Sequence, residues 1–189
     1  MPLAQVIAQN LQPIGGALAV LPVIGVHPAH HIPGFHVPRQ EQTNWCWAAV
    51  AAGVAAHYGA VWQQCDIAGL ELGQHCCTAG KNSGVCNVPY FLDLALTRVG
   101  HFETMKDTAV PLSPYVIAEI SADRPLGVRV GWGGAGDDGH FLAIAGYSTI
   151  GEQFVDVEDP WWSASTVPYA VLRSAYQGDG SWTHTYWTN

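Results

Sequence analysis

The stretch Gln40-Glu41-Gln42-Thr43-Asn44-Trp45-Cys46-Trp47-Ala48-Ala49 decides how this chain can be interpreted. It places Cys46 at the start of an alanine-rich segment that predicts a helix from Asn44 to Tyr58, with Asn44 as the cap and Gly59 as the terminating glycine. A cysteine in the first helical turn faces the positive end of the helix dipole, which favours the thiolate. Cys46 is therefore a candidate nucleophile, although a free cysteine can equally be a core residue.

Two glutamines upstream of this cysteine offer neutral amide donors. Gln40 and Gln42 precede Cys46 by six and four positions. An amide N–H directed at a developing oxyanion stabilises the transition state of acyl transfer. The local sequence therefore offers a nucleophile together with two possible partners for an oxyanion.

The composition limits the classes of protein to consider. The chain has 189 residues, enough for one domain with a sizeable core, and it is 49% hydrophobic and 12% charged. Seven basic residues against 15 acidic ones argue against nucleic acid or an anionic membrane as a partner. The apolar run from Ile14 to Val26 is too short to span a bilayer, and it lacks the basic start of a Sec signal peptide. We expect neither a nucleic-acid-binding nor a transmembrane protein.

Four further cysteines are clustered in the chain: Cys65, Cys76, Cys77 and Cys86. With Cys46 left over, they predict two disulfides and one free thiol, and therefore a secreted, extracellular protein. Because adjacent cysteines rarely bond each other, Cys76 and Cys77 should have different partners, one being Cys65 and the other Cys86. The alternative is a zinc site made of the four cysteines, or of three with His75, although the spacing differs from that of paired C-x-x-C knuckles.

The N-terminal segment differs from the rest of the chain. It contains no charged side chain, the first of the chain being Arg39, and prolines occur throughout it. We interpret residues 1–37 as an arm or propeptide-like segment that could lie in a cleft as an intramolecular inhibitor, and residues 38–189 as the folded domain. The arm also carries four histidines that could bind a metal, although a solvated or strand-like arm is the simpler interpretation: His27, His30, His31 and His36.

The hydrophobic period changes from helical to strand-like along the chain. After the Cys46 helix, helices are expected at 63–72, 89–99 and 114–121, and strands at 126–131, 140–147, 153–159, 167–172 and 181–188. Helices followed by strands predict an α+β domain in which the Cys46 helix packs on an antiparallel sheet.

A nucleophilic cysteine needs a base and a group that orients the base. His57 lies in the same predicted helix, eleven residues from Cys46 and therefore about 16 Å away. His184 lies in an otherwise ordinary strand. His140 stands out because it begins a strand that is followed by a turn and by a second strand ending at Asp159.

One hairpin register aligns both strands. It pairs Ile144 with Val155, Leu142 with Val157, and His140 with Asp159, so the ionisable pair ends an apolar ladder. A carboxylate at the buried end of such a ladder should be paired, and the facing histidine is its natural partner. An ordinary cross-strand contact is the alternative, and a β-bulge would bring Glu158 forward in place of Asp159.

Gln40, Cys46-Trp47, Gly139-His140 and Asp159-Pro160 together resemble the papain-like cysteine peptidases. The resemblance covers about residues 37–188 and is nearest to a compact bacterial branch that includes plant-pathogen effector proteases and bacteriocin-leader peptidases. It implies a papain-like α+β fold, no cofactor and no metal. It also implies a role for each motif residue: Cys46 as nucleophile, His140 as general base and acid, Asp159 as the residue that orients the imidazole, and Gln40, ahead of Gln42, as oxyanion donor beside the Cys46 N–H.

The resemblance leaves several functions open. The chain carries Trp45 directly before Cys46, where plant and lysosomal members have Cys-Gly-Ser before the Cys-Trp pair, and it has Asp159 where they usually have Asn. The expected function is cleavage of a protein or peptide substrate by a monomeric thiol peptidase. The alternatives are a deamidase, transamidase or cell-wall amidase with the same triad, a catalytically silent binding module, and a zinc-dependent enzyme. Trp161 and Trp162 could shield the His–Asp pair from water or belong to the core.

Overall fold

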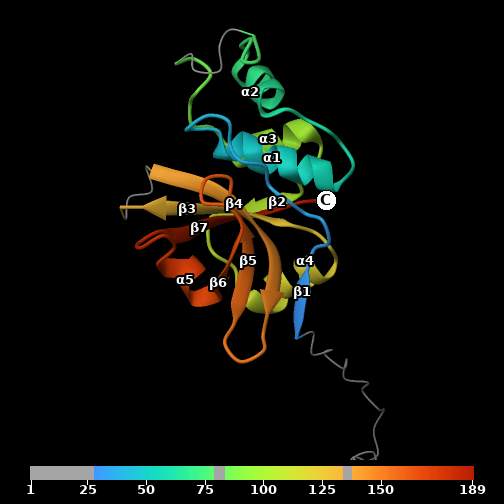
Figure 1. Ribbon diagram of the computed structural model, residues 1–189, viewed down its shortest axis with the longest axis vertical. Helices are drawn as coiled ribbons and strands as arrows, with labels where there is room; N and C mark the ends of the chain where they lie inside the picture. The colour runs from blue at the N-terminus through green and yellow to red at the C-terminus, as the bar shows by residue number, and fades with distance from the viewer. Residues whose placement is uncertain (1–27, 79–83, 134–137) are drawn as a thin grey trace, which may run out of the picture.

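The computed structural model describes residues 28–78, 84–133 and 138–189. Its helical part packs against one end of an antiparallel sheet, as the helix-then-strand pattern predicts (Figure 1). The helical part consists of three helices: α1 (Cys46–His57), α2 (Gln64–Leu72) and α3 (Leu92–Val99). The α+β fold class is therefore confirmed.

The sheet has the strand order β2-β7-β3-β4-β5-β6, with β1 paired to the far end of β4. The central pair β3–β4 and its neighbours are antiparallel. The strands are β1 (Ala29–His31), β2 (Thr104–Lys106), β3 (Leu126–Trp132), β4 (Asp138–Ser148), β5 (Phe154–Glu158), β6 (Ser165–Pro168) and β7 (Ser181–Trp187).

Helix α1 is buried along most of its length, from Cys46 to Ala55. Small alanine side chains allow it to lie between α2, α3 and the sheet, and at Gly53 the backbone of His36 comes so close that an added Cβ would lie 2.8 Å from its carbonyl oxygen. The helix ends before Gly59, which has the left-handed conformation expected for a terminating glycine, with φ of +90°.

The predicted cap of this helix is wrong. Trp45, not Asn44, stands at the N-cap position, and no side chain caps the helix there. The Asn44 side chain instead donates to the carbonyl oxygen of Asn87, while the Asn44 N–H donates to the Asn87 side chain. The local capping preference of Asn44 gives way to these contacts with a segment far along the chain.

The predicted β4–β5 register is also wrong, by two residues. Ile144 pairs with Val157 rather than with Val155, and a bulge at Ala145 shifts the pairing further along the hairpin. Beyond the bulge the slip is three residues, since Tyr147 pairs with Val155. Between the bulge and the His140 end of the hairpin, the slip of two residues keeps the side chains on their predicted faces because strand side chains alternate with period two. His140 and Asp159 therefore still lie on one face, although they are not directly opposite each other.

Two further elements differ from the prediction. The strand expected at 167–172 ends at Pro168, and helix α5 (Tyr169–Ser174) follows it. Proline has no N–H to continue the ladder, and its φ of −54° suits the start of a helix. The helix expected at 114–121 is found as a wide helical turn, η3 (Leu112–Val116), that runs into α4 (Ile117–Ser121).

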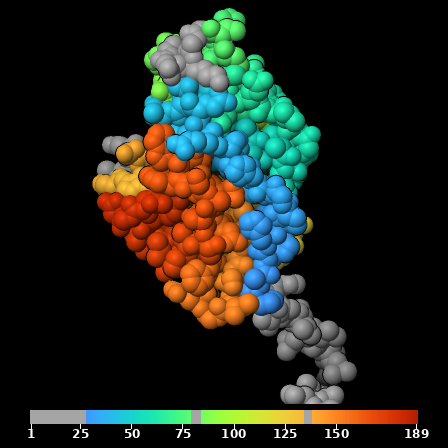
Figure 2. Space-filling model, in the orientation of Figure 1, coloured from blue at the N-terminus to red at the C-terminus, as the bar shows by residue number. Residues whose placement is uncertain are grey.

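The segment from residue 28 to residue 37 is part of the folded domain. β1 pairs with β4, and Ile32, Phe35 and Val37 are buried. In Figure 2 the segment runs along the junction between the helical part and the strands β4 and β5. The structured domain thus begins earlier than the boundary at residue 37, because apolar side chains of the proline-rich segment enter the core.

The remainder of the predicted arm, residues 1–27, lies outside the described residues, and with it His27 and the proposed inhibitory segment. The other three histidines each face a carboxylate. His30 lies 2.7 Å from Asp123, His31 lies 3.1 Å from Asp156, and His36 lies 2.8 Å from Glu158. These three pairs attach the segment to the domain.

The predicted disulfide pattern is confirmed. Cys65 is bonded to Cys77 and Cys76 to Cys86, while Cys46 is a free thiol. The four sulfur atoms that the zinc alternative requires are therefore engaged in two covalent bonds. Among the helices of the described residues, none has both the length and the apolar character needed to cross a bilayer.

Candidate active site

Cys46 is the first residue of α1 and lies at the junction between helices and sheet. Its side chain is buried and lines a cavity of about 430 Å³ together with Gln40, His140 and Trp162. Cys46 belongs to α1, Gln40 to the segment before it, His140 to β4, and Trp162 to the segment after β5. The fold thus brings together residues that lie far apart in the sequence.

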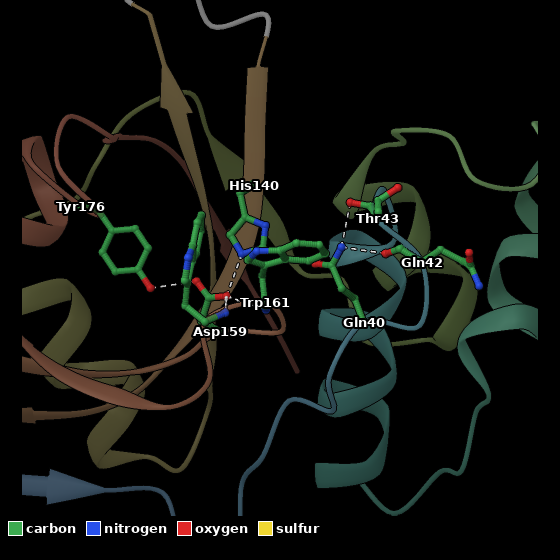
Figure 3. Close-up of polar contacts among 8 residues, drawn as sticks. Gln40, Gln42, Thr43, His140, Asp159, Trp161 and Tyr176 are labelled. Carbon is green, nitrogen blue, oxygen red and sulfur yellow. Dashed lines mark hydrogen bonds and ion pairs between the residues drawn. The ribbon is translucent and has the colours of Figure 1, made fainter. Parts of the chain in front are cut away.

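His140 lines this cavity and forms a buried pair with Asp159 behind it (Figure 3). The Nε2 atom of His140 lies 2.9 Å from Oδ1 of Asp159, and both residues are at most 9% exposed. The same oxygen accepts the N–H groups of Trp161 at 2.7 Å and Trp162 at 2.9 Å, while Tyr176 donates its hydroxyl to Oδ2 at 2.8 Å. With Nε2 bound to Asp159, Nδ1 is the ring nitrogen left for Cys46.

The electrostatics of the pair follow from its surroundings. Burial lowers the pKa of His140, but hydrogen bonds and charge from Asp159 and Cys46 outweigh it and raise the pKa to about 9. Burial raises the pKa of Asp159, yet His140 and the N–H groups of Trp161 and Trp162 hold it below its usual value. At neutral pH these shifts favour an imidazolium between a carboxylate and the Cys46 sulfur.

Gln40 reaches the cavity, but its amide is already engaged. Its Nε2 donates to the carbonyl oxygens of Gln42 at 2.7 Å and Thr43 at 2.8 Å, as Figure 3 shows, and its own N–H donates to Pro160. Its Oε1 is buried and, among the described residues, has no hydrogen-bond partner. Gln40 can donate to an oxyanion only after releasing one of the two carbonyls, because an amide nitrogen has two protons.

The start of α1 is held by the last cysteine of the cluster and by a residue just after it. Trp45 donates its indole N–H to the carbonyl of Cys86 at 2.7 Å, and Trp47 donates to that of Val88 at 3.2 Å. These two indoles flank Cys46 in the sequence. The position of the thiol therefore depends on residues 86–88 as well as on the helix.

Aromatic rings cover the histidine. The ring of Trp162 meets His140 edge-on at 5.2 Å and lies 6.0 Å from the ring of Trp132. Trp161 and Trp162 both remain almost half exposed and line the cavity, so they are cleft residues rather than core residues. Of the two, Trp162 is the one that packs against the His140 ring.

The other candidates for base and carboxylate, His57, His184 and Glu158, do not line this cavity. The Nε2 atom of His57 contacts the carbonyl oxygen of Asp123, and His184 lies beside Thr183 on β7. The Glu158 carboxylate, the alternative to Asp159, accepts the N–H of Val37 and contacts His36. Two neighbours of the pair, Trp132 and Tyr176, carry no motif in the sequence that would have pointed to them.

The His, Cys, Asp and Glu side chains of the described residues give little support to a metal site. Among the described residues, one group of three His, Cys, Asp or Glu side chains has its ligand atoms within 4.8 Å of one another: Cys65, Asp66 and Cys77. The two sulfurs of this group are bonded to each other and are not available as thiolates. The group therefore does not fit a thiolate-bound metal.

The structure resembles the peptidase domain of Streptococcus ComA, a bi-functional ABC transporter involved in a quorum-sensing pathway. The likeness covers 82% of this chain and 98% of that domain, with a TM-score of 0.55 and 17% sequence identity. The fold is papain-like. No family model and no curated protein sequence matches the chain. At this identity the likeness concerns the fold alone, so the chemistry has to be argued from the site.

Proposed function

We propose that the protein is a thiol peptidase that cleaves peptide bonds with Cys46, His140 and Asp159. The observation that carries the proposal is the buried His140, which interacts with Asp159 on one side and with Cys46 on the other and has a pKa of about 9. Such a histidine is protonated at neutral pH and can share its proton with a thiolate. The position of Cys46 at the N-terminal end of α1 adds the favourable end of the helix dipole.

The first half of the reaction forms an acyl-enzyme. The Cys46 thiolate attacks the carbonyl carbon of the scissile bond, and the electron pair of the C=O bond moves to oxygen. As the tetrahedral intermediate collapses, the C–N bond breaks and His140 gives its proton to the leaving amine. Asp159 stabilises the imidazolium before this transfer and keeps the ring oriented toward the sulfur.

The second half consumes water. His140, now neutral, takes a proton from a water molecule whose oxygen attacks the thioester carbonyl. The C–S bond then breaks, which releases the carboxylic acid and restores the thiolate beside the imidazolium. The carboxylic acid ionises by passing its proton to the solvent.

The oxyanion would be stabilised by two N–H groups. The Cys46 N–H, as a first-turn amide, has no acceptor within the helix. The Gln40 amide would supply the second by exchanging one of its two carbonyl partners for the oxyanion, which is more strongly charged and therefore the better acceptor.

The test compares variants in hydrolysis of a peptide library. Cys46→Ala and His140→Ala should abolish cleavage, whereas His184→Ala, which removes a histidine outside the cavity, should keep it. Mass analysis of the products separates peptide-bond cleavage from deamidation or transamidation. Cleavage that persists in Cys46→Ala would contradict the proposal. So would the finding that iodoacetamide alkylates Cys46 no faster than a free thiol at mildly acidic pH.

We further propose that the enzyme is exported and acts as a monomer on protein or peptide substrates. The two disulfides support export, because such bonds persist in oxidising compartments. Thiol titration of unfolded, unreduced protein from its native source should give one free thiol per chain. Five free thiols would argue for a reducing compartment instead.

A further inference from the structure

A tyrosine outside the proposed triad donates to the carboxylate that faces His140. Tyr176 is 1% exposed, and its hydroxyl lies 2.8 Å from Oδ2 of Asp159. Oδ1 of this carboxylate already accepts three N–H groups, those of His140, Trp161 and Trp162. Within the described part of the chain, Tyr176 is the one hydrogen-bond donor to Oδ2.

The backbone holds Tyr176 independently of Asp159. Tyr176 lies between α5 and β7, where its N–H and C=O both pair with Gly180 at 2.9 Å and close a tight turn. Its ring packs edge-on against Trp162, with ring centroids 6.3 Å apart. The hydroxyl thus reaches Asp159 from a fixed position, as Figure 3 shows.

The chemistry of the contact is that of a neutral donor to a charged acceptor. Burial, together with the charge of Asp159, raises the pKa of Tyr176 well above its ordinary value, so the hydroxyl stays protonated. The titratable groups that contact the Asp159 carboxylate are then His140 and Tyr176, with Cys46 beyond the imidazole. The neighbouring Glu158 carboxylate is engaged by His36 and Val37 instead.

We propose that Tyr176 is a positioning residue that holds the Asp159 carboxylate in the orientation that His140 requires. Without the hydroxyl, Oδ2 would be a buried charged oxygen without a partner, and the carboxylate could turn about its Cβ–Cγ bond to regain one. Such a turn would weaken the contact between Oδ1 and His140 and, through it, the imidazolium–thiolate pair. The proposal rests on the proposed function insofar as it concerns peptide cleavage.

The variant Tyr176→Phe tests this, with Tyr169→Phe as a matched control. Tyr169 is also buried, and its hydroxyl donates to the carbonyl of Val110, away from the cavity. Tyr176→Phe should lower kcat roughly tenfold, as expected for one hydrogen bond to a charged group, with little change in KM. The acid midpoint of the rate of Cys46 alkylation by iodoacetamide should rise by up to about one pH unit, because Asp159 protonates more readily. Tyr169→Phe should match the wild type in both measurements.

A double-variant cycle separates positioning from a general structural effect. On an Asp159→Ala background, Tyr176→Phe should cause no further loss of kcat; a further tenfold loss there would overturn the proposal. Equal behaviour of Tyr176→Phe and Tyr169→Phe would also overturn it. If the wild type alkylates rapidly but cleaves no peptide, the peptidase proposal fails, while a shifted alkylation midpoint in Tyr176→Phe still supports the positioning role.

Discussion

Asp159 accepts the Nε2–H of His140 at 2.9 Å in a place that is almost completely shielded from water. Because both side chains are largely removed from water, each depends on the other for its charged form. His140 has its pKa raised from 6.5 to about 9, and Asp159 has its pKa lowered below 3.8. The pair therefore links the stability of the fold to pH at both ends of the range.

The first prediction concerns stability. The contribution of His140 is complete below its unfolded pKa of 6.5 and is lost as the pH rises through about 9. That of Asp159 is complete above 3.8 and is lost at lower pH. The free energy of unfolding of the wild type, relative to His140→Gln, should thus fall between pH 6.5 and 9, by on the order of 2–3 kcal/mol. Urea unfolding at several pH values measures it, and a constant difference across this range would contradict the pKa shift.

The second prediction separates the charge of Asp159 from its geometry. In Asp159→Asn the side-chain oxygen can still accept from His140, and the amide can donate to the Tyr176 oxygen. The orientation is therefore kept while the charge is lost, so the pKa of His140 should fall. The alkaline limb of kcat/KM should move to lower pH, with much of the activity near pH 6 retained.

Asp159→Ala serves as the comparison. It removes the acceptor as well as the charge, so kcat should drop at every pH, by roughly 10²-fold or more. If the Asn and Ala variants lost activity equally, the carboxylate would act through its charge alone.

The third prediction concerns the two glutamines. Gln40→Ala should lower kcat by roughly 10–10²-fold, because the Nε2 donor to the oxyanion is lost, while KM stays nearly constant. The side chain of Gln42 does not line the cavity; its backbone carbonyl holds Gln40. Gln42→Ala should therefore have less than about a twofold effect on kcat, since it leaves that carbonyl in place. Steady-state kinetics of both variants measure these losses of kcat. A larger loss in Gln42→Ala than in Gln40→Ala would make Gln42 the donor.

The chemistry of the site could be predicted from local sequence, whereas its supports could not. Cys46 begins a helix because an alanine-rich segment follows it, and His140 faces the Asp159 side because the alternation of side chains survives a two-residue slip in register. The slip itself could not be foreseen, since it combines a longer turn, over residues 149–153, with a one-residue bulge at Ala145 that leaves no mark in an apolar run.

Contacts between distant segments could not be predicted from the sequence for a different reason. Asn44 does not cap the helix because its side chain bonds to Asn87 instead. Tyr176 contacts Asp159 from a turn closed by Gly180. Neither pairing follows from periodicity or from a motif, because both depend on where loops return in space. Local preferences predict elements, but such contacts decide which residues support the site.

The last prediction concerns the disulfide next to the nucleophile. Cys86 belongs to the segment that binds both indoles beside Cys46, and its bond to Cys76 anchors that segment. Removing either disulfide by paired substitution to alanine should lower the free energy of unfolding by about 2–3 kcal/mol, since the two close loops of similar length. Activity should respond differently: without Cys76–Cys86 the start of α1 is less well held, so kcat should fall several-fold.

The matched control is the other disulfide. The bond between Cys65 and Cys77 joins α2 to the segment that follows it, and neither cysteine lines the cavity or accepts the N–H of an indole that flanks Cys46. Its removal should leave kcat within about twofold of the wild type at a temperature where both variants are folded. Equal losses of kcat in the two variants would mean that the segment 86–88 does not position Cys46, and that stability alone connects the disulfides to activity.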